Sequence, residues 1–180
     1  MNMPHTRRSI RLQNYDYSQP GAYFVTLFAH ERADLFGEIA NGEMRLNALG
    51  RVAAECWDAI PAHFPDVELD AYCMMPNHFH GIVVITDPVG ATHASPLPND
   101  RSAGPPRRSL GAIVGSFKSV ATKLIRELRH APALVVWQRN YYEHVIRSDS
   151  ELNKFRNYIA NNLLRWAEDE NNPARLKQNL

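Results

Sequence analysis

The sequence has few cysteines, no long apolar segment and almost no excess of charge. Cys56 and Cys73 are its two cysteines and no C-x-x-C spacing is present, which excludes a disulfide scaffold and a cysteine-rich zinc site. No apolar run approaches the roughly 20 residues that cross a bilayer. The opening stretch MNMPHTRRSIR lacks the apolar core of a signal peptide. We therefore expect a soluble cytoplasmic protein with no membrane partner.

The formal net charge is only +1, from 20 Lys and Arg against 19 Asp and Glu, so any binding of anions must come from local clusters. Hydrophobic residues make up 44% and charged residues 22%, as is usual in globular proteins. The length of 180 residues predicts a single domain over residues 1–180. Within it, the Pro-, Ser-, Gly- and Asn-rich segment 87–108 predicts a flexible loop.

Hydrophobic periodicity predicts a mixed α and β protein. The expected strands cover 22–29, 67–75, 78–85 and 142–146, with a short hairpin that turns at Asn41-Gly42. The expected helices begin at the N-cap Asn47, at Ser109, and at Ser148, whose spacing to Glu151 fits a capping box. The expected apolar face of the second of these helices consists of Leu110, Val114, Phe117, Val120, Ala121 and Leu124. The order β-α-β-β-α-β followed by a last helix is typical of the ferredoxin-like split pattern. The predicted fold class is therefore α+β, an antiparallel ferredoxin-like sheet with helices packed on it.

Two histidines stand one residue apart in the stretch MMPNHFHGIVVI, at the start of a predicted strand. Because alternate residues of a strand face the same side, His78 and His80 project together and Phe79 projects to the other side. Two neighbouring neutral imidazoles can hold one divalent metal ion. The alternative is a pair of ordinary histidines at a strand edge, since an isolated H-x-H is a weak motif.

A tyrosine lies on the last predicted helix, beside the positions that would face the sheet. Those apolar positions are Leu152, Phe155, Ile159 and Leu163. Tyr158 lies about 60° around the helix axis from Phe155, and Asn162 follows it by one turn on the same face. The spacing predicts a phenol and an amide presented together towards the sheet. The alternative is a boundary tyrosine with its hydroxyl in water.

Three ordered blocks, MPNHFHGIVVI, WQRNYYEHVIRSDSEL and YIANN, resemble successive blocks of the single-tyrosine HUH transposases, and more narrowly of the REP-associated tyrosine transposases. The stretches RRSIRLQNYDYSQPGAYFVTLFA and GEMRLNALGRV also resemble this branch. The likeness covers residues 7–167 apart from the central loop. One departure is Asn162-Leu163, where related sequences usually read Asn-Pro.

The resemblance implies a fold of the HUH endonuclease type and a role for each motif residue. It implies that His78 and His80 are metal ligands, that Tyr158 is the catalytic nucleophile and that Asn162 is the third metal ligand. The implied metal is Mg²⁺ or Mn²⁺, of which imidazole ligands favour Mn²⁺. The implied enzyme is a transposase that cleaves and rejoins single-stranded or hairpin DNA through a 5′-phosphotyrosine, which stores the bond energy without ATP.

Local basic groups are the candidates for contacts with DNA. They are Arg7, Arg8, Arg11, Lys118, Lys123, Arg126 and Arg139, with Trp137 as a base-stacking candidate. The alternative is that the helix bearing Lys118 is merely a solvated basic face, and that WQRNYY is core and strand. Members of the domesticated branch tend to act as monomers, so the resemblance favours a monomer over a homodimer.

Two other functions remain open. The first is a hairpin-DNA-binding protein of the same fold with weak or no catalytic activity. The second is a zinc hydrolase that uses His78, His80 and His144, although the sequence lacks the glutamate base of an H-E-x-x-H motif.

Overall fold

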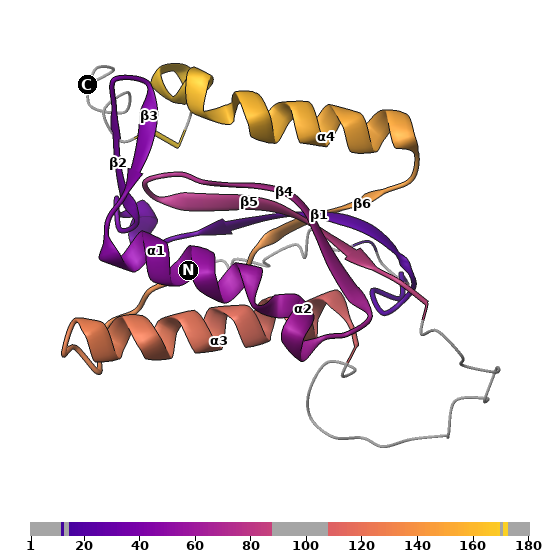
Figure 1. Ribbon diagram of the computed structural model, residues 1–180, viewed down its shortest axis with the longest axis horizontal. Helices are drawn as coiled ribbons and strands as arrows, with labels where there is room; N and C mark the ends of the chain where they lie inside the picture. Colours follow the sequence, from indigo (N-terminus) through magenta and orange to yellow (C-terminus); the bar gives the residue numbers. More distant parts are fainter. Residues whose placement is uncertain (1–11, 13–14, 88–107, 170, 173–180) are drawn as a thin grey trace, which may run out of the picture.

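The computed structural model describes residue 12 and residues 15–87, 108–169 and 171–172 (Figure 1). A four-stranded antiparallel sheet has the strand order β4-β5-β1-β6. Its strands are β1 (Gly21–Phe28), β4 (Val67–Met74), β5 (His78–Ile85) and β6 (Tyr142–Ile146), and β2 (Gly37–Ala40) and β3 (Glu43–Leu46) form a separate hairpin. The helices are α1 (Ala48–Asp58), α2 (Ile60–His63), α3 (Leu110–Leu128) and α4 (Asp149–Asn162), with 3-10 turns η1 (His30–Arg32) and η2 (Leu163–Glu168).

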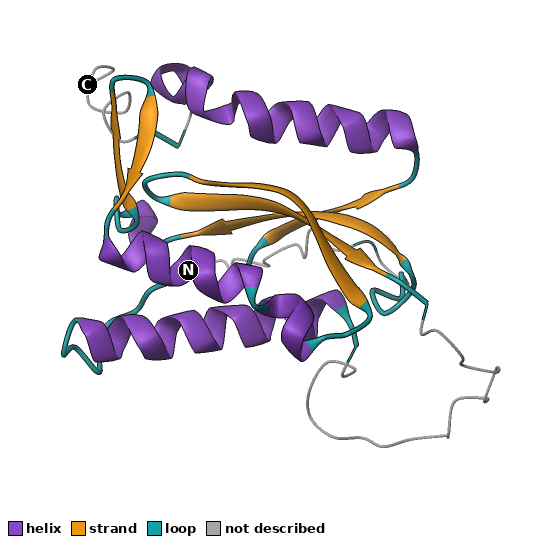
Figure 2. Cartoon of the chain, in the orientation of Figure 1, coloured by secondary structure: helices purple, strands orange, loops and turns teal. Residues whose placement is uncertain are grey.

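Helices cover both faces of this sheet. α1 and α3 lie on one face and α4 lies on the other (Figure 2). α1 connects β1 to β4 and α3 connects β5 to β6, so the strand order is that of the split β-α-β arrangement. The predicted α+β class and antiparallel ferredoxin-like sheet are confirmed. No helix among the described residues is long and apolar enough to span a bilayer.

The central strand β5 separates two hydrophobic cores because its side chains alternate between the two faces. Phe79, Val83 and Ile85 belong to the large core under α1 and α3. Ile82 belongs to a small core beneath α4, whose other buried members are Phe24, Ile146 and Ile159. The prediction that β5 is buried on both faces is confirmed. Through the same alternation, His78 and His80 lie on the α4 face.

Local signals place the ends of the elements as predicted. Asn41 and Gly42 have φ angles of 56° and 78°, the positive values that a two-residue hairpin turn requires. Asn47 caps α1 by accepting hydrogen bonds from the amides of Leu49 and Gly50. Ser109 and Ser148 cap α3 and α4 in the same way. Side-chain caps in the sequence therefore determine where α1, α3 and α4 start.

The structure corrects the predicted buried face of α3 only in part, since Leu110, Val114, Phe117 and Ala121 are buried as predicted. The sequence pattern placed Val120 and Leu124 on that face, but they are 44% and 40% exposed. Ile113 and Ile125 are fully buried instead, because α3 packs on the sheet and α1 along a stripe rotated around its axis. The flexible loop predicted over 87–108 lies outside the described residues except for its two end residues, and one domain over 1–180 stays a prediction.

Candidate active site

His78 and His80 lie side by side near the start of β5, with ring centroids 4.7 Å apart. Both side chains are buried. Burial lowers the pKa of His78 to about 4, and burial followed by the charge of His78 lowers the pKa of His80 well below its ordinary value. Both imidazoles are therefore neutral at neutral pH, the state in which a ring nitrogen can act as a ligand.

Asn77 fixes the tautomer of His78. The Asn77 side-chain nitrogen donates to two carbonyls, those of Arg32 at 3.2 Å and Asn171 at 2.8 Å. Its oxygen must therefore accept the hydrogen bond that joins it to Nδ1 of His78 at 2.8 Å. The proton of His78 then resides on Nδ1, and Nε2 carries a free lone pair.

His80 stands between a threonine and the tyrosine of α4. Its Nδ1 lies 2.8 Å from Oγ1 of Thr26, which is the register partner of His80 on β1. When Nδ1 donates to Thr26, the lone pair of Nε2 is directed away from β1. The Tyr158 hydroxyl lies 3.3 Å from this Nε2, and the ring centroids of the two residues are 5.1 Å apart. The structure thus brings together residues that are 78 positions apart in the chain.

Asn162 is buried one turn beyond Tyr158 although it is polar. Two aromatic residues on either side of Asn162 in the chain contact the histidines. The Tyr158 ring contacts that of His80, and the Trp166 ring lies 5.9 Å from that of His78. The departure Asn162-Leu163 does not break the helical path, because α4 ends at Asn162 and continues directly as η2. The predicted stripe is only partly right, since Ile159 is buried while Leu152, Phe155 and Leu163 are half-buried.

Two buried acceptors near this helix have no hydrogen-bond partner within the described part of the chain. They are Nε2 of His78 and Oδ1 of Asn162. An unsatisfied buried acceptor is costly, and a cation removes that cost without a donor hydrogen. The described residues contain no group of three or more His, Cys, Asp or Glu side chains able to hold a metal ion. Two imidazoles with an amide oxygen nevertheless fit a divalent ion that keeps water ligands.

The site opens into a pocket of about 610 Å³. Arg32 and Lys154 contribute positive charge to its wall, and neither was identified from the sequence. The Arg32 guanidinium donates to Oδ1 of Asn171 and lies 4.2 Å from the centre of the Phe28 ring. The pocket is lined by Phe24, Thr26, Phe28, Arg32, His80, Tyr142, Lys154, Phe155, Tyr158 and Asn171. Tyr158 is 41% exposed, so its phenol is accessible from the pocket.

A turn after η2 joins the site through Asn171, whose carbonyl accepts the hydrogen bond from the Asn77 side chain. The backbone and side-chain nitrogens of Asn171 both donate to Oδ1 of Asp169, at 2.7 and 2.8 Å. The Asn172 side chain donates to the carbonyl of Trp166 at 3.0 Å. The charge of Asp169 acts to raise the pKa of His78 against the larger effect of burial. Only the tertiary structure brings this turn to the site, so its residues carry no signal in the sequence spacing.

The predicted DNA-contact residues fall into three groups. Arg7, Arg8 and Arg11 lie outside the described residues. Lys118, Lys123, Arg126 and Arg139 line one groove on the α3 side of the sheet. Trp137 corrects a prediction: it is only 6% exposed and contacts the rings of Phe36 and Phe117, so it is part of the core and is not placed to stack on bases.

The zinc hydrolase alternative is wrong about His144. His144 lies on β6, where its Nε2 is 2.7 Å from Oε1 of Glu151 and its ring lies 5.0 Å from that of Phe155. It pairs in register with Phe24, whereas His80 pairs with Thr26. Its engagement with Glu151 leaves His78 and His80 without a third histidine among the described residues.

One of the solved structures that align with this chain supports the fold. No protein-family model matches the chain. A solved structure of a REP-associated tyrosine transposase bound to a REP hairpin aligns with a TM-score of 0.56 and 18% identity, over 86% of this chain and 73% of that one. A structure from Deinococcus radiodurans aligns with a TM-score of 0.44 and 15% identity, over 84% of this chain and 97% of that one.

The sequence comparison gives the family. An uncharacterized protein of Haemophilus influenzae is 40% identical over 169 residues, which are 92% of this chain and 93% of that protein. The resemblance to the REP-associated tyrosine transposases, found in the motifs, is confirmed in the fold. The chain therefore belongs to one family with this Haemophilus influenzae protein, and it has the fold of a REP-associated tyrosine transposase.

Proposed function

We propose that this protein is a metal-dependent transposase that cleaves and transfers single-stranded DNA at a hairpin or palindrome. The observation that carries the proposal is the position of the Tyr158 hydroxyl, 3.3 Å from Nε2 of His80 in an open pocket. A nucleophile must lie beside the group that stabilises the reacting phosphate, and this pocket has room for a phosphodiester. The solved neighbour is bound to a REP hairpin, which supports a hairpin DNA as partner.

In the proposed first step, the Tyr158 oxygen attacks the phosphorus of a phosphodiester. The bond from phosphorus to the 3′-oxygen breaks, the phenolic proton passes to solvent, and the leaving 3′-oxygen takes a proton. The product is a 5′-phosphotyrosine with a free 3′-hydroxyl. In the second step another 3′-hydroxyl attacks the same phosphorus and releases Tyr158, so one phosphodiester is restored without ATP.

The chain's own residues bind and orient the reactants. His78, His80 and Asn162 would hold Mg²⁺ or Mn²⁺, which would supply positive charge to a non-bridging phosphate oxygen. Asn77 and Thr26 hold the two imidazoles in place through their Nδ1 atoms. Arg32 and Lys154, at the pocket wall, would attract the negatively charged strand.

Covalent capture tests this function. The full chain is incubated with Mn²⁺ or Mg²⁺ and a DNA hairpin whose single-stranded flanks are randomised, and the products are separated under denaturing conditions. DNA labelled at its 3′ end is expected to become attached to the protein, while DNA labelled at its 5′ end is released as a shorter free strand. Tyr158→Phe should abolish the attachment, because it removes the attacking oxygen.

Tyr72→Phe is the matched control, since Tyr72 lies on β4 with its hydroxyl bonded to Asp58, outside the pocket. It should keep the covalent product. His78→Ala and His80→Ala should lose the product but retain hairpin binding. Binding of the hairpin with no covalent product under either metal would sink the nuclease proposal and favour the non-catalytic DNA-binding protein.

A further inference from the structure

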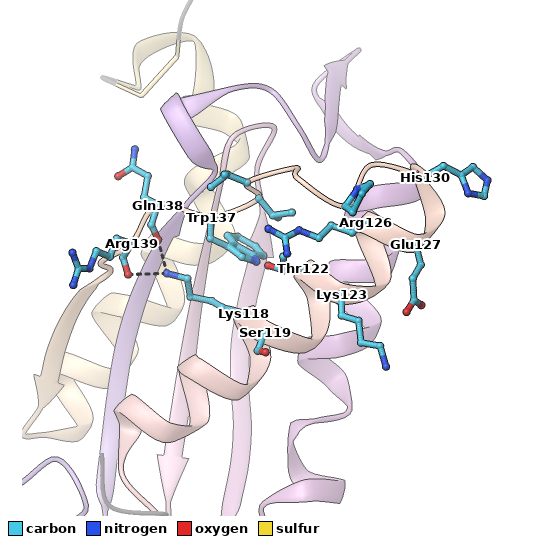
Figure 3. A pocket seen from close by; sticks show the side chains of 13 residues that line it. Lys118, Ser119, Thr122, Lys123, Arg126, Glu127, His130, Trp137, Gln138 and Arg139 are labelled. Atoms are coloured by element: carbon cyan, nitrogen blue, oxygen red, sulfur yellow. Dashed lines mark hydrogen bonds between the residues drawn. The ribbon is translucent and has the colours of Figure 1, made fainter. Parts of the chain in front are cut away.

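A second concave surface lies on the face of the sheet opposite α4 and Tyr158. It is a groove of about 1030 Å³ between α3 and the segment 132–139 (Figure 3). Its lining contains four cationic side chains, Lys118, Lys123, Arg126 and Arg139, and one carboxylate, Glu127. Four positive charges less one negative charge leave an excess of three, whereas the whole chain has a net charge of only +1. Positive charge is thus concentrated here.

Lys118 and Arg126 form hydrogen bonds that join α3 to the segment 132–139 across the groove. The Lys118 ammonium donates to the carbonyls of Gln138 and Arg139, at 2.5 and 3.2 Å (Figure 3). Nε of Arg126 donates to the carbonyl of Leu134 at 2.8 Å. Carbonyl groups do not neutralise the Arg126 guanidinium, and although burial lowers the pKa of Lys118 to about 8, its ammonium keeps most of its charge at pH 7. The groove is therefore built by side chains that join its two walls.

The groove is connected to the tyrosine pocket along the edge of the sheet. Arg139 lines the groove and Tyr142 lines the pocket, and only two residues of the chain lie between them, so their Cα atoms are at most about 10 Å apart. The amide of Gln138 also donates to the carbonyl of Phe28, another residue of the pocket. A strand that leaves the pocket would therefore reach the groove across Tyr142 and Arg139.

We propose that this groove binds the phosphate backbone of the DNA arm that flanks the cleaved bond. The inference rests on the proposed function for the identity of the nucleic acid and on the groove's own charge for the mode of contact. Lys123 and Arg139 make the phosphate contacts, while Lys118 and Arg126 hold the groove's shape and add to its field. Contacts of this kind position DNA without reading its sequence.

The test is direct binding of DNA by the full chain. A fluorescein-labelled DNA hairpin with single-stranded flanks of arbitrary sequence is titrated with protein over a series of salt concentrations. Each phosphate that a cation neutralises adds about 0.9 to the magnitude of the slope of log K against log salt for a duplex, or about 0.7 for a single strand. Lys123→Gln and Arg139→Gln are each expected to weaken binding several-fold and to reduce the slope by the amount that corresponds to one phosphate.

Two further variants separate charge from damage to the fold. Glu127→Gln removes the carboxylate of the groove and should strengthen binding, an effect opposite in sign to that of a weakened fold. Arg147→Gln removes the same charge as Arg139→Gln, but from an exposed position between β6 and α4 outside both pockets, and should change neither affinity nor slope. Both arginines are replaced by the same neutral side chain.

The outcomes distinguish this proposal from the proposed function. The proposal that the groove binds DNA would be overturned by either of two results. One is that Lys123→Gln and Arg139→Gln both keep the DNA affinity and the salt slope of the unaltered chain, and the other is that the unaltered chain does not bind DNA. If these variants bind DNA normally and also form the covalent product, the proposal for the groove fails while the proposed function stands. Weakened binding in the variants without any covalent product from the unaltered chain would support the groove while the nuclease proposal fails.

Discussion

Asn77 is a single residue with an effect on the candidate metal ligand beside it. Because its amide nitrogen is committed to two carbonyls, its oxygen selects the Nδ1-protonated form of His78. We predict that Asn77→Ala allows the proton to move to Nε2, and that affinity for Mn²⁺ falls about 10- to 100-fold, as is typical when a ligand's orienting partner is removed. Nitrogen-15 NMR of the metal-free protein reports the tautomer, and calorimetry reports the Mn²⁺ affinity.

Asn161→Ala is the control for that prediction, because Asn161 is an exposed amide on α4 that donates to its own helix at the Asn157 carbonyl. It should leave both measurements unchanged. If His78 in Asn77→Ala keeps its proton on Nδ1 and binds Mn²⁺ as before, Asn77 has no positioning role.

At the residue scale, sequence spacing predicted which side chains share a face, while the roles assigned to them came from the resemblance to the transposase family. His78 and His80 follow from strand alternation, and Tyr158 with Asn162 follows from helical spacing. Thr26 could not be found, because its contact with His80 depends on the register between β1 and β5. Trp137 was misassigned because an aromatic residue in a polar stretch has the same sequence signal whether it packs in the core or faces solvent.

Among the elements, β5 and α1 approach each other closely at a position where β5 has no side chain. A Cβ at Gly81 would lie 2.6 Å from Cζ2 of Trp57 on α1 and 2.8 Å from Cε1 of Phe79. We predict that Gly81→Ala lowers the free energy of unfolding by about 1–3 kcal/mol, since buried rings must shift to admit a methyl group. Urea unfolding monitored by circular dichroism measures the change.

Gly115→Ala supplies a control of opposite sign. A Cβ at Gly115 would meet nothing within 4 Å, and the residue is exposed inside α3. The substitution should raise the free energy of unfolding by about 0.5–1 kcal/mol, because alanine favours a helix over glycine. Equal stability of the two variants would contradict the packing argument at Gly81.

The elements themselves were predictable, while their orientation was predictable only in part. Caps and turns set the boundaries, as at Asn47 and Ser148, because these signals act within a few residues. Part of the buried face of α3 was predicted wrongly, because Val120 and Ile125 are both apolar and hydrophobic periodicity alone does not show which of them is buried. The packing against α1 and the sheet makes that choice.

For the whole molecule, the buried histidines predict weaker folding in acid. The folded-state pKa of His78 is about 4, below the unfolded value of 6.5, and that of His80 is also lowered. The unfolded chain therefore binds more protons than the folded chain below about pH 6.5. Stability should be fully present above that pH and should decline as the pH falls from about 6.5 towards about 4, which urea midpoints at about pH 7.5 and about pH 5 would show.

His78→Gln should flatten this dependence, since glutamine does not titrate. His63→Gln replaces an exposed histidine on α2 and is the matched control, with the pH dependence of the unaltered chain. A steep decline of stability over the same pH interval that persists in His78→Gln would assign the effect to other groups.

At this scale the order of elements was enough to predict the sheet, because few topologies accommodate β-α-β-β-α-β. The sequence did not predict that the tyrosine pocket and the basic groove lie on opposite faces of the sheet. Lys118 and Arg139 are far apart in the chain, and only the return of the segment 132–139 to α3 places them in one groove on the far side from Tyr158.

The small core under α4 has an evolutionary consequence. The helix that bears Tyr158 rests on only a few apolar side chains, whereas α1 and α3 share the extensive core on the other face. Substitutions that loosen α4 would then abolish the proposed DNA cleavage long before they unfold the chain. A copy that had lost the proposed cleavage would still fold through the larger core, so the loss of one proposed function need not remove the protein.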